Sequence, residues 1–213
     1  MCSSDLVAAA ITAAGGTATA HGVDVTDEAQ VQRAVDEAVA AHGRIDIAHN
    51  NAGMTSPPSA FTDLSLDAWN IMLATNLTSV FVCMQIELRL MAAQGWGSII
   101  NTSSGAGVVA APGLPHYTAA KHGVLGLTKC AAQEYAARGI RVNAVLPGTT
   151  RTPMIEGFIG GNADIEKMVT RGIGRRSMGS ADEIAQAVVW LGSDRASFVN
   201  GESMLVDGAT VCR

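Results

Sequence analysis

Residues 97–121 read GSIINTSSGAGVVAAPGLPHYTAAK, and this stretch decides the fold class. The segment Gly97–Thr102 is a short, mostly apolar run followed by a glycine-rich turn, which is typical of a buried strand. The turn leads into apolar positions at helical spacing, which predict a helix from about Tyr117 to Arg138. A buried strand that passes through a tight turn into a helix is the repeating unit of a parallel α/β sheet.

The same alternation of strand and helix extends in both directions along the chain. On the N-terminal side we expect an alanine-rich helix at Leu6–Ala14, a strand at Thr17–Val25, a helix that Thr26 caps and Gly43 ends, a strand at Ile45–Ala48 and a long helix at Leu66–Ala93. On the C-terminal side we expect a strand at Ile140–Leu146, a loose glycine-rich stretch to Gly179, a helix at Ala181–Leu191 and a strand at Ser203–Val206. Because right-handed crossovers place helices over both faces of a parallel sheet, residues 1–213 are predicted to form a single Rossmann-like, doubly wound α/β domain.

The composition argues against nucleic-acid and membrane partners. Apolar residues make up 48% of the chain, and the formal net charge of -5 comes with no run of Lys or Arg. The longest apolar stretches are interrupted before the roughly 20 residues that a membrane-spanning helix needs. The cysteines Cys2, Cys83, Cys130 and Cys212 form no C-x-x-C pair and lie at no zinc-binding spacing. We therefore expect a cytoplasmic protein with reduced thiols, no metal site and a small-molecule substrate.

The strongest chemical signal is the pair Tyr117 and Lys121, which lie at positions i and i+4 of the predicted helix. A cation on the same helix face favours the ionised phenol, so we expect Lys121 to lower the pKa of Tyr117 and allow proton transfer near neutral pH. An isolated pair of this kind is more often a solvated helix face.

Two further polar residues support the functional interpretation of this pair. Ser104 follows the strand Gly97–Thr102, so its hydroxyl is predicted to lie at the carboxyl edge of the sheet, where open α/β sheets bind ligands. Asn76 lies within the apolar helical segment Leu73–Val82, where a side-chain amide needs hydrogen-bond partners. Ser103 is the alternative to Ser104, and the spacing to Tyr117 favours Ser104.

Asn76, Ser104, Tyr117 and Lys121, together with the run Asn50-Asn51-Ala52-Gly53, resemble the motifs of the classical short-chain dehydrogenases/reductases. The resemblance implies that Tyr117 is the general acid/base, that Ser104 orients the substrate oxygen, that Lys121 assists Tyr117 and binds the nicotinamide ribose, and that Asn76 holds a water in a proton relay. It implies no catalytic role for His116, for which a pocket-wall or surface role is the better expectation. His49 is expected to be a tolerated substitution at an apolar strand position. The prolines and methionines around Pro153-Met154 and Met168 are expected to form an adaptable substrate lid within the glycine-rich stretch from Thr150 to Gly179.

The resemblance also implies a set of cofactor-binding residues: Asp24, Val25, Asn51, Ala52, Gly53, Tyr117, Lys121, Pro147, Gly148 and Thr152. Asp24 would meet the adenine ring, and Pro147, Gly148 and Thr152 would hold the nicotinamide carboxamide. For Asp24 and Thr152 a simple turn or helix-capping role is equally compatible with the sequence, because Asp and Thr favour such positions.

The family's glycine-rich turn and second strand have no counterpart in the printed sequence, since Gly15-Gly16 follows a helix and is better explained as its end. We expect a truncated chain whose sheet has a gap about two strands wide after Thr17–Val25, with poor folding and weak cofactor binding. The residue that distinguishes NAD from NADP belongs to the segment without a counterpart, so both cofactors stay open.

The resemblance implies an oxidoreductase that interconverts a secondary alcohol and a ketone by hydride transfer with NAD or NADP. The nearest alternative is a 3-oxoacyl-thioester reductase of fatty-acid synthesis, followed by dehydrogenases of sugars, sterol-like alcohols or cyclic diols. A non-catalytic binding protein on the same scaffold is the alternative of another class, and an intact set of the four residues argues against it. Relatives of this kind pair through their long helices and their last strand, so we expect a homotetramer or homodimer.

Overall fold

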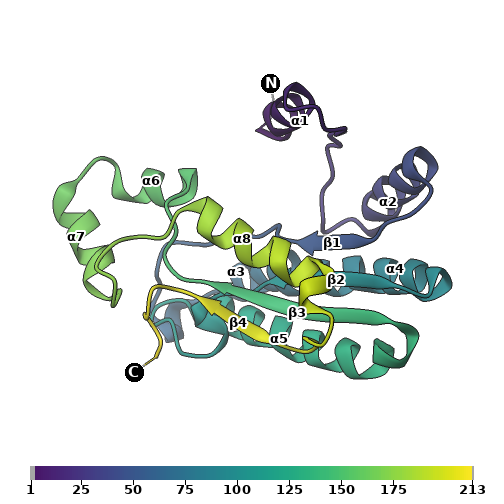
Figure 1. Cartoon of the computed structure of the whole chain (residues 1–213). Coiled ribbons are helices and arrows are strands. Elements are labelled where there is room, and N and C mark those ends of the chain that lie inside the picture. The colour runs from purple at the N-terminus through teal and green to yellow at the C-terminus, as the bar shows by residue number, and fades with distance from the viewer. Residues whose placement is uncertain (1–2, 213) are drawn as a thin grey trace.

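The computed structural model describes residues 3–212 and contains a parallel sheet in the order β1-β2-β3-β4 (Figure 1). The strands are β1 Ile47–Asn50, β2 Gly97–Thr102, β3 Ile140–Pro147 and β4 Ser203–Val206. The helices are α1 Ser3–Ala13, α2 Glu28–His42, α3 Leu66–Leu73, α4 Ser79–Gln94, α5 Pro115–Tyr135, α6 Pro153–Ile159, α7 Ala163–Arg171 and α8 Ala181–Gly192. All three strand pairs are parallel, which confirms the predicted α/β class.

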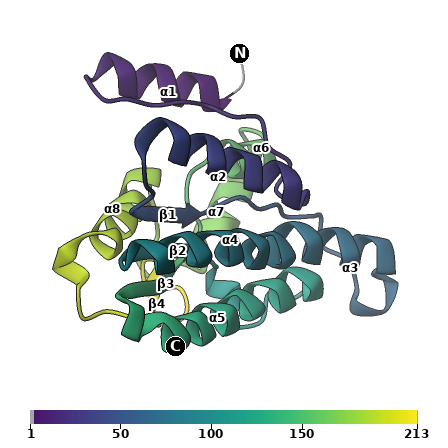
Figure 2. The same ribbon diagram turned by 90° about the vertical axis from the view of Figure 1, so that its right-hand side faces the viewer.

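Helices cover both faces of the sheet: α4 and α5 pack on one face and α8 on the other (Figures 1 and 2). Alternate strand residues therefore face two different cores, as the two-residue period of a strand requires. Ile99 and Val142 belong to the core under α4 and α5, whereas Ile100 and Val145 belong to the core under α8. All four side chains are fully buried, so the two central strands fix the positions of everything attached to their ends.

The predicted long helix is continuous from Leu66 to Gln94, but its middle, Ala74–Thr78, is π-helical. Among the described residues, this run alone has the length and apolar composition of a membrane span, with 29 residues and a mean hydropathy of 1.5. We expected every apolar stretch to be interrupted before about 20 residues, and for this run that was wrong, because polar residues such as Asn76 lie within the helix without ending it. Met84 and Met91 of the run lie in the core on the sheet, so burial there accounts for its apolar composition.

The strand predicted at Thr17–Val25 does not form, and this prediction was wrong. The segment is mostly exposed and belongs to no strand. The reason is the lack of a partner: no strand of the described residues lies beside it, and a single extended segment cannot satisfy its backbone groups by a ladder. In the structure it links α1 to α2 (Figure 1).

Two element boundaries also differ from the prediction. Asp27, not Thr26, caps α2, because its carboxylate accepts hydrogen bonds from the backbone N–H groups of Ala29 and Gln30. The first strand begins at Ile47 rather than Ile45. The side-chain amide of Gln94 bonds both backbone groups of Ile45, so these groups are not available to a strand.

The stretch after β3, expected to be loose, contains the two short helices α6 and α7. Side chains accept hydrogen bonds at both N-termini: Thr152 caps α6 and Asn162 caps α7. The helices share a small core around Ile159, Ile173 and Met178, which is separate from the cores on the sheet. The segment is therefore a folded unit with its own packing, and we call residues 151–178 the lid.

Candidate active site

The four residues of the predicted catalytic set lie near the carboxyl ends of β1 and β2. Asn76 comes from the π-helical segment between α3 and α4, and its side chain is fully buried. Its Nδ2 donates to the backbone oxygen of Met54 and its Oδ1 accepts from the backbone N–H of Met54, both at 2.8 Å. Asn76 therefore fastens the loop that follows β1. π-Helical turns occur frequently at functional sites, and here the turn brings a polar side chain into an apolar helix pair.

The two serines after β2 have different roles. The hydroxyl of Ser103 is buried and donates to the backbone oxygen of Lys121 at 2.8 Å, so it joins β2 to α5. Ser104 is half-buried, and its hydroxyl accepts a hydrogen bond from the backbone N–H of Ala106 at 3.1 Å. Its O–H bonds the phenol oxygen of Tyr117, whereas the O–H of Ser103 is used by the backbone of Lys121.

Tyr117 and Lys121 lie on one face of α5, with Nζ of Lys121 5.7 Å from the centroid of the Tyr117 ring. The pKa of Tyr117 is raised, chiefly because burial disfavours the phenolate, and a hydrogen bond with Ser104 opposes this rise. We expected Lys121 to lower this pKa, and for the described residues that expectation was wrong. The ammonium lies over the ring and donates to the backbone oxygen of Thr102 at 2.9 Å rather than to the phenol oxygen. Burial therefore has the largest effect on the pKa of Tyr117.

The Lys121 side chain is 4% exposed, and burial lowers its pKa to about 8. Gly53 lies directly beside it: a Cβ at this position would be 3.7 Å from Nζ of Lys121 and 3.3 Å from Oδ1 of Asn76. A side chain at residue 53 would therefore crowd both groups. This contact places the end of the Asn50-Asn51-Ala52-Gly53 run against the catalytic set.

The asparagines of this run make different contacts. Asn50 donates from Nδ2 to Glu87 of α4 and to Asn101 of β2, both at 3.0 Å, so it ties the strand to its neighbours. Asn51 accepts at Oδ1 from the hydroxyl of Thr102 at 3.0 Å, and the same hydroxyl lies 2.9 Å from Nε2 of His49. We expected His49 to be only a tolerated substitution. Its ring instead contacts the Thr102 hydroxyl that bonds Asn51, so His49 helps to orient Asn51 through Thr102.

The remaining predicted cofactor residues lie in three places. Asp24 is exposed, and its carboxylate accepts from the backbone and the hydroxyl of Thr26, which lowers its pKa. Val25 is half-buried beside it. Thr152 caps α6, so both Asp24 and Thr152 occupy the local turn or cap roles that the sequence also allowed. Pro147 ends β3, and Gly148 follows where a Cβ would lie 2.6 Å from Cα of Asp207, so only glycine fits.

A sequence model of a family described as enoyl-(acyl carrier protein) reductase, of the short-chain alcohol dehydrogenase type, matches residues 3–209. The chain is a short-chain dehydrogenase/reductase. It is 41% identical over 199 residues to a cyclohexanol dehydrogenase of an Acinetobacter species, a match that covers 93% of this chain and 77% of that protein. It is 37% identical to a 3-oxoacyl-[acyl-carrier-protein] reductase of Thermotoga maritima, over 92% of this chain and 78% of that protein.

The solved structures agree with this membership. A gluconate 5-dehydrogenase from Burkholderia cenocepacia in complex with NADP and tartrate has a TM-score of 0.90 and 32% identity, and the match covers 98% of this chain and 81% of that one. The Rossmann-like fold and the oxidoreductase class of this short-chain dehydrogenase/reductase are thereby shown.

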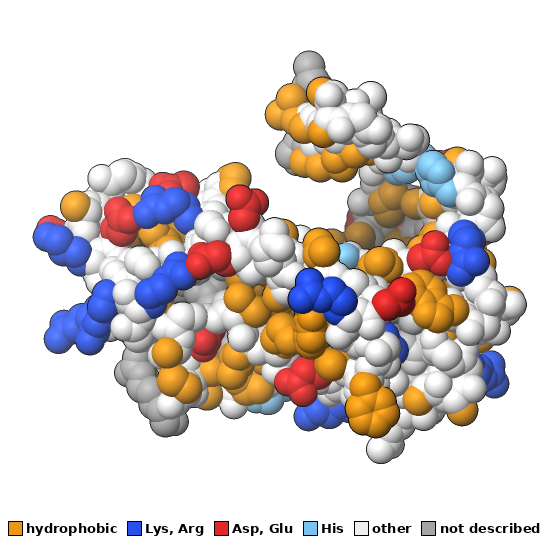
Figure 3. All heavy atoms as spheres, viewed as in Figure 1, with side chains coloured by type: hydrophobic (Ala, Val, Ile, Leu, Met, Phe, Trp, Pro, Cys, Tyr) orange, Lys and Arg blue, Asp and Glu red, His pale blue; other side chains and the backbone are white. Residues whose placement is uncertain are grey.

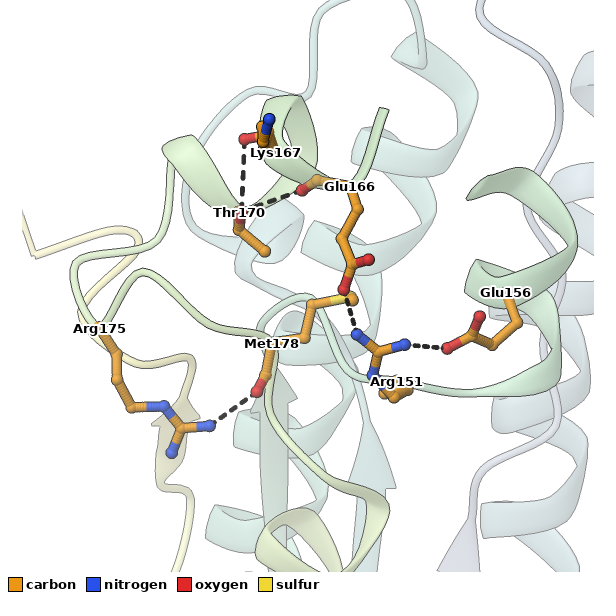
Figure 4. A network of polar contacts seen from close by, with 7 residues as sticks. All are labelled: Arg151, Glu156, Glu166, Lys167, Thr170, Arg175 and Met178. Atoms are coloured by element: carbon orange, nitrogen blue, oxygen red, sulfur yellow. Dashed lines mark hydrogen bonds and ion pairs between the residues drawn. The ribbon is translucent and has the colours of Figure 1, made fainter. Parts of the chain in front are cut away.

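The lid of the short-chain dehydrogenase/reductase is held together by charge as well as by its core (Figure 4). The guanidinium of Arg151, at the base of the lid, bonds Glu156 of α6 through one nitrogen and Glu166 of α7 through another. At the other end Arg175 bonds Glu183 of α8 and the backbone oxygen of Met178. The two short helices are thus joined to each other by one side chain.

The sequence does not predict the contact between His116 and Ser56. Nε2 of His116 lies 3.0 Å from Oγ of Ser56, and the His116 side chain is 1% exposed. The two residues are 60 positions apart, so no local pattern could reveal the contact. The only signal was a histidine directly before the candidate acid/base Tyr117.

Proposed function

We propose that this short-chain dehydrogenase/reductase interconverts a secondary alcohol and a ketone with NAD or NADP, using Tyr117 as general acid/base. The observation that carries the proposal is the clustering of Tyr117, Ser104, Lys121 and Asn76 at the carboxyl ends of the strands. Open α/β sheets bind their ligands at this edge.

The described residues fit the nicotinamide ribose end of such a cofactor. The buried ammonium of Lys121 has one hydrogen-bond acceptor among the described residues, the backbone oxygen of Thr102, although it carries three N–H donors. Donors left over on a buried cation suit the vicinal hydroxyls of a ribose. Gly53 is exposed, and its lack of a side chain keeps this ammonium and Asn76 uncrowded. NADP in the related gluconate 5-dehydrogenase supports this assignment.

The proposed chemistry divides between the cofactor and the side chains. A nicotinamide held beside Lys121 would supply the hydride acceptor for oxidation of the alcohol and the hydride donor for reduction of the ketone. Tyr117 takes the hydroxyl proton in oxidation and gives it back in reduction, while the adjacent Ser104 hydroxyl holds the substrate oxygen. Because burial raises the pKa of Tyr117, its neutral form predominates at neutral pH and favours reduction. Oxidation should accelerate as the pH rises.

We propose a cyclic alcohol such as cyclohexanol as the substrate class. The support is the higher identity to the cyclohexanol dehydrogenase than to the 3-oxoacyl reductase. Reduction of a 3-oxoacyl thioester is the second candidate, supported by the same relative of Thermotoga maritima and by the description of the family model.

The test is turnover of cyclohexanol with NAD and with NADP, followed by the absorbance of the reduced cofactor, in parallel with reduction of an acetoacetyl thioester. We expect Tyr117→Phe to abolish turnover while cofactor binding, measured by calorimetry, is retained. Tyr135→Phe at the far end of the same helix is the matched control and should keep the wild-type rate. Undiminished turnover by Tyr117→Phe would refute the mechanism.

We also propose that the enzyme is cytoplasmic and forms a homodimer or homotetramer through α8 and β4. Cys83, Cys130 and Cys212 are free thiols, which suits a reducing compartment. Hydrophobic side chains gather over α8 and β4 (Figure 3). Val189 of α8 is 66% exposed, and Phe198, in the segment between α8 and β4, is fully exposed. Light scattering of Phe198→Asp should report a smaller particle than the wild type, and an unchanged mass would contradict this interface.

A further inference from the structure

His116 is a buried histidine, and the proposed mechanism gives it no role. It lies in the first turn of α5, directly before Tyr117, and its side chain is 1% exposed. Burial lowers its pKa, and the positive end of the helix dipole also disfavours an imidazolium there. The ring is therefore neutral at neutral pH and carries one hydrogen.

The contacts of the ring decide which nitrogen carries this hydrogen. Nε2 lies 3.0 Å from Oγ of Ser56, whereas the buried Nδ1 has no hydrogen-bond partner among the described residues. A buried N–H without an acceptor is rarer in proteins than a buried acceptor without a donor. The hydrogen therefore belongs on Nε2, which donates to Ser56, and Nδ1 keeps only its lone pair. In this arrangement the hydroxyl of Ser56 acts as acceptor, and its own hydrogen is free to be donated.

Ser56 belongs to a loop that is fastened at three points, one of them Asn76 of the catalytic set and the other two in and just before α5. Asn76 holds Met54 by two hydrogen bonds, His116 holds Ser56, and the backbone N–H of Ser59 donates to the oxygen of Gly113 at 2.9 Å. The loop begins at the carboxyl end of β1, next to the strand whose end carries Ser104. Ser56 itself is half-buried, so a ligand can reach it.

We propose that His116 is a positioning residue and Ser56 a specificity-determining residue: His116 holds the loop and orients the Ser56 hydroxyl to donate to a second oxygen of the substrate. The substrate class that fits is a diol, hydroxyketone or hydroxy acid, in which one oxygen reacts at Tyr117 and another meets Ser56. This inference rests on the proposed function. The inference adds to the proposed function the substituent that the site prefers, a second oxygen on the substrate.

The experiment compares cyclohexanol with cyclohexane-1,2-diol in the wild type, Ser56→Ala, His116→Phe and the double variant. One neutral hydrogen bond is worth about 1 kcal/mol, so each single variant should lose about fivefold more kcat/KM for the diol than for cyclohexanol, mainly through KM. The double variant should lose no more than either single one, because the two residues act as a unit. His116→Gln, whose amide can donate to Ser56, should restore part of the preference. Equal losses for both alcohols, or additive losses, would overturn the proposal.

Hydrogen exchange supplies a readout that does not need turnover. His116→Phe keeps a ring of similar size but cannot bond Ser56, so the amides of Thr55, Ser56 and Ser59 should exchange faster while those of β2 and β3 do not change. His116→Gln should slow the exchange again. If neither alcohol is turned over, the proposed function fails, and loop exchange identical in His116→Phe and wild type would independently refute the role of His116.

Discussion

The side-chain amide of Asn76 and the backbone of Met54 form a reciprocal pair of hydrogen bonds, each 2.8 Å long. Asn76 therefore fixes the loop after β1 by pairing with both backbone groups of one residue, as a neighbouring strand would. The resemblance implied a water-holding role for this residue, and the structure adds a loop-fastening role that needs no ligand.

Replacing Asn76 by Ala should loosen this loop and destabilise the protein. The variant leaves both backbone groups of the half-buried Met54 without their partners, which should cost about 2 kcal/mol of unfolding free energy. Urea denaturation measures the loss. Asn70→Ala, at an exposed position of α3, is the control and should stay within about 0.5 kcal/mol of the wild type. If the two variants were equally stable, the Met54 bonds would contribute nothing.

The fold was predictable where strands are short apolar runs between turn residues and unpredictable where long-range contacts decide. The bounds of β2 and β4 followed from their apolar runs alone. The start of β1 did not, because the Gln94 side chain, distant in sequence, takes the backbone groups of Ile45. The two helices of the lid were not predicted, because glycines lie within α6 and on both sides of α7. Their cap residues Thr152 and Asn162 are nevertheless of the usual types.

The candidate site shows the same division. The residue types and their order along the chain indicated the set Asn76, Ser104, Tyr117 and Lys121. The electrostatics of the set could not be predicted, because the extent of burial depends on the whole fold. A Tyr-Lys pair on a helix face predicts a lowered phenol pKa, yet burial raises it here.

Glu87 should make the protein less stable as the pH rises. Its carboxyl group is almost completely buried, and burial raises its pKa to about 7 from an ordinary value of 4.5. The folded protein therefore holds a proton that the unfolded chain releases, so stability is full below about pH 4.5 and falls as the pH rises towards 7. The total loss corresponds to about 3 kcal/mol.

The variant Glu87→Gln should remove most of this pH dependence, because a neutral amide can still accept the hydrogen bond from Asn50. We expect it to be more stable than the wild type at pH 8 and similar to it at pH 4.5, by thermal unfolding at both values. Glu202→Gln, at an exposed position, is the matched control and should follow the wild type. A wild-type melting temperature that does not change between the two values would show that Glu87 is not protonated when folded.

Arg151 should control the lid with little effect on the rest of the molecule. Its bonds to Glu156 and Glu166 join α6 to α7, but all three side chains are substantially exposed (Figure 4). Exposed ion pairs contribute little to global stability, so Arg151→Gln should leave the melting temperature close to that of the wild type. Amide exchange in residues 153–171 should nevertheless accelerate, and KM should rise more than kcat falls.

High salt should have a similar effect on the wild-type lid, because it screens the same charges. Arg89→Gln, an exposed arginine on α4, is the control and should change neither lid exchange nor KM. Lid exchange in Arg151→Gln that matches the wild type would mean that the apolar core of the lid is sufficient to hold α6 and α7 together.

Ala209 is strained, and glycine at this position should stabilise the protein. Its φ of 67° lies in the left-handed region, where a Cβ atom costs about 1 kcal/mol, and its N–H is committed to the carboxylate of Asp207 at 2.9 Å. Glycine accepts this conformation without the steric penalty, although it gains entropy in the unfolded chain, so we expect a net gain of about 0.5 kcal/mol. Ala137→Gly, in the helical turn Ala136–Arg138, should instead destabilise the protein by a similar amount. Opposite shifts of the melting temperature in the two variants would identify backbone strain as the cause, whereas a loss of stability in both would assign the Ala209 methyl group a packing role against Gly174.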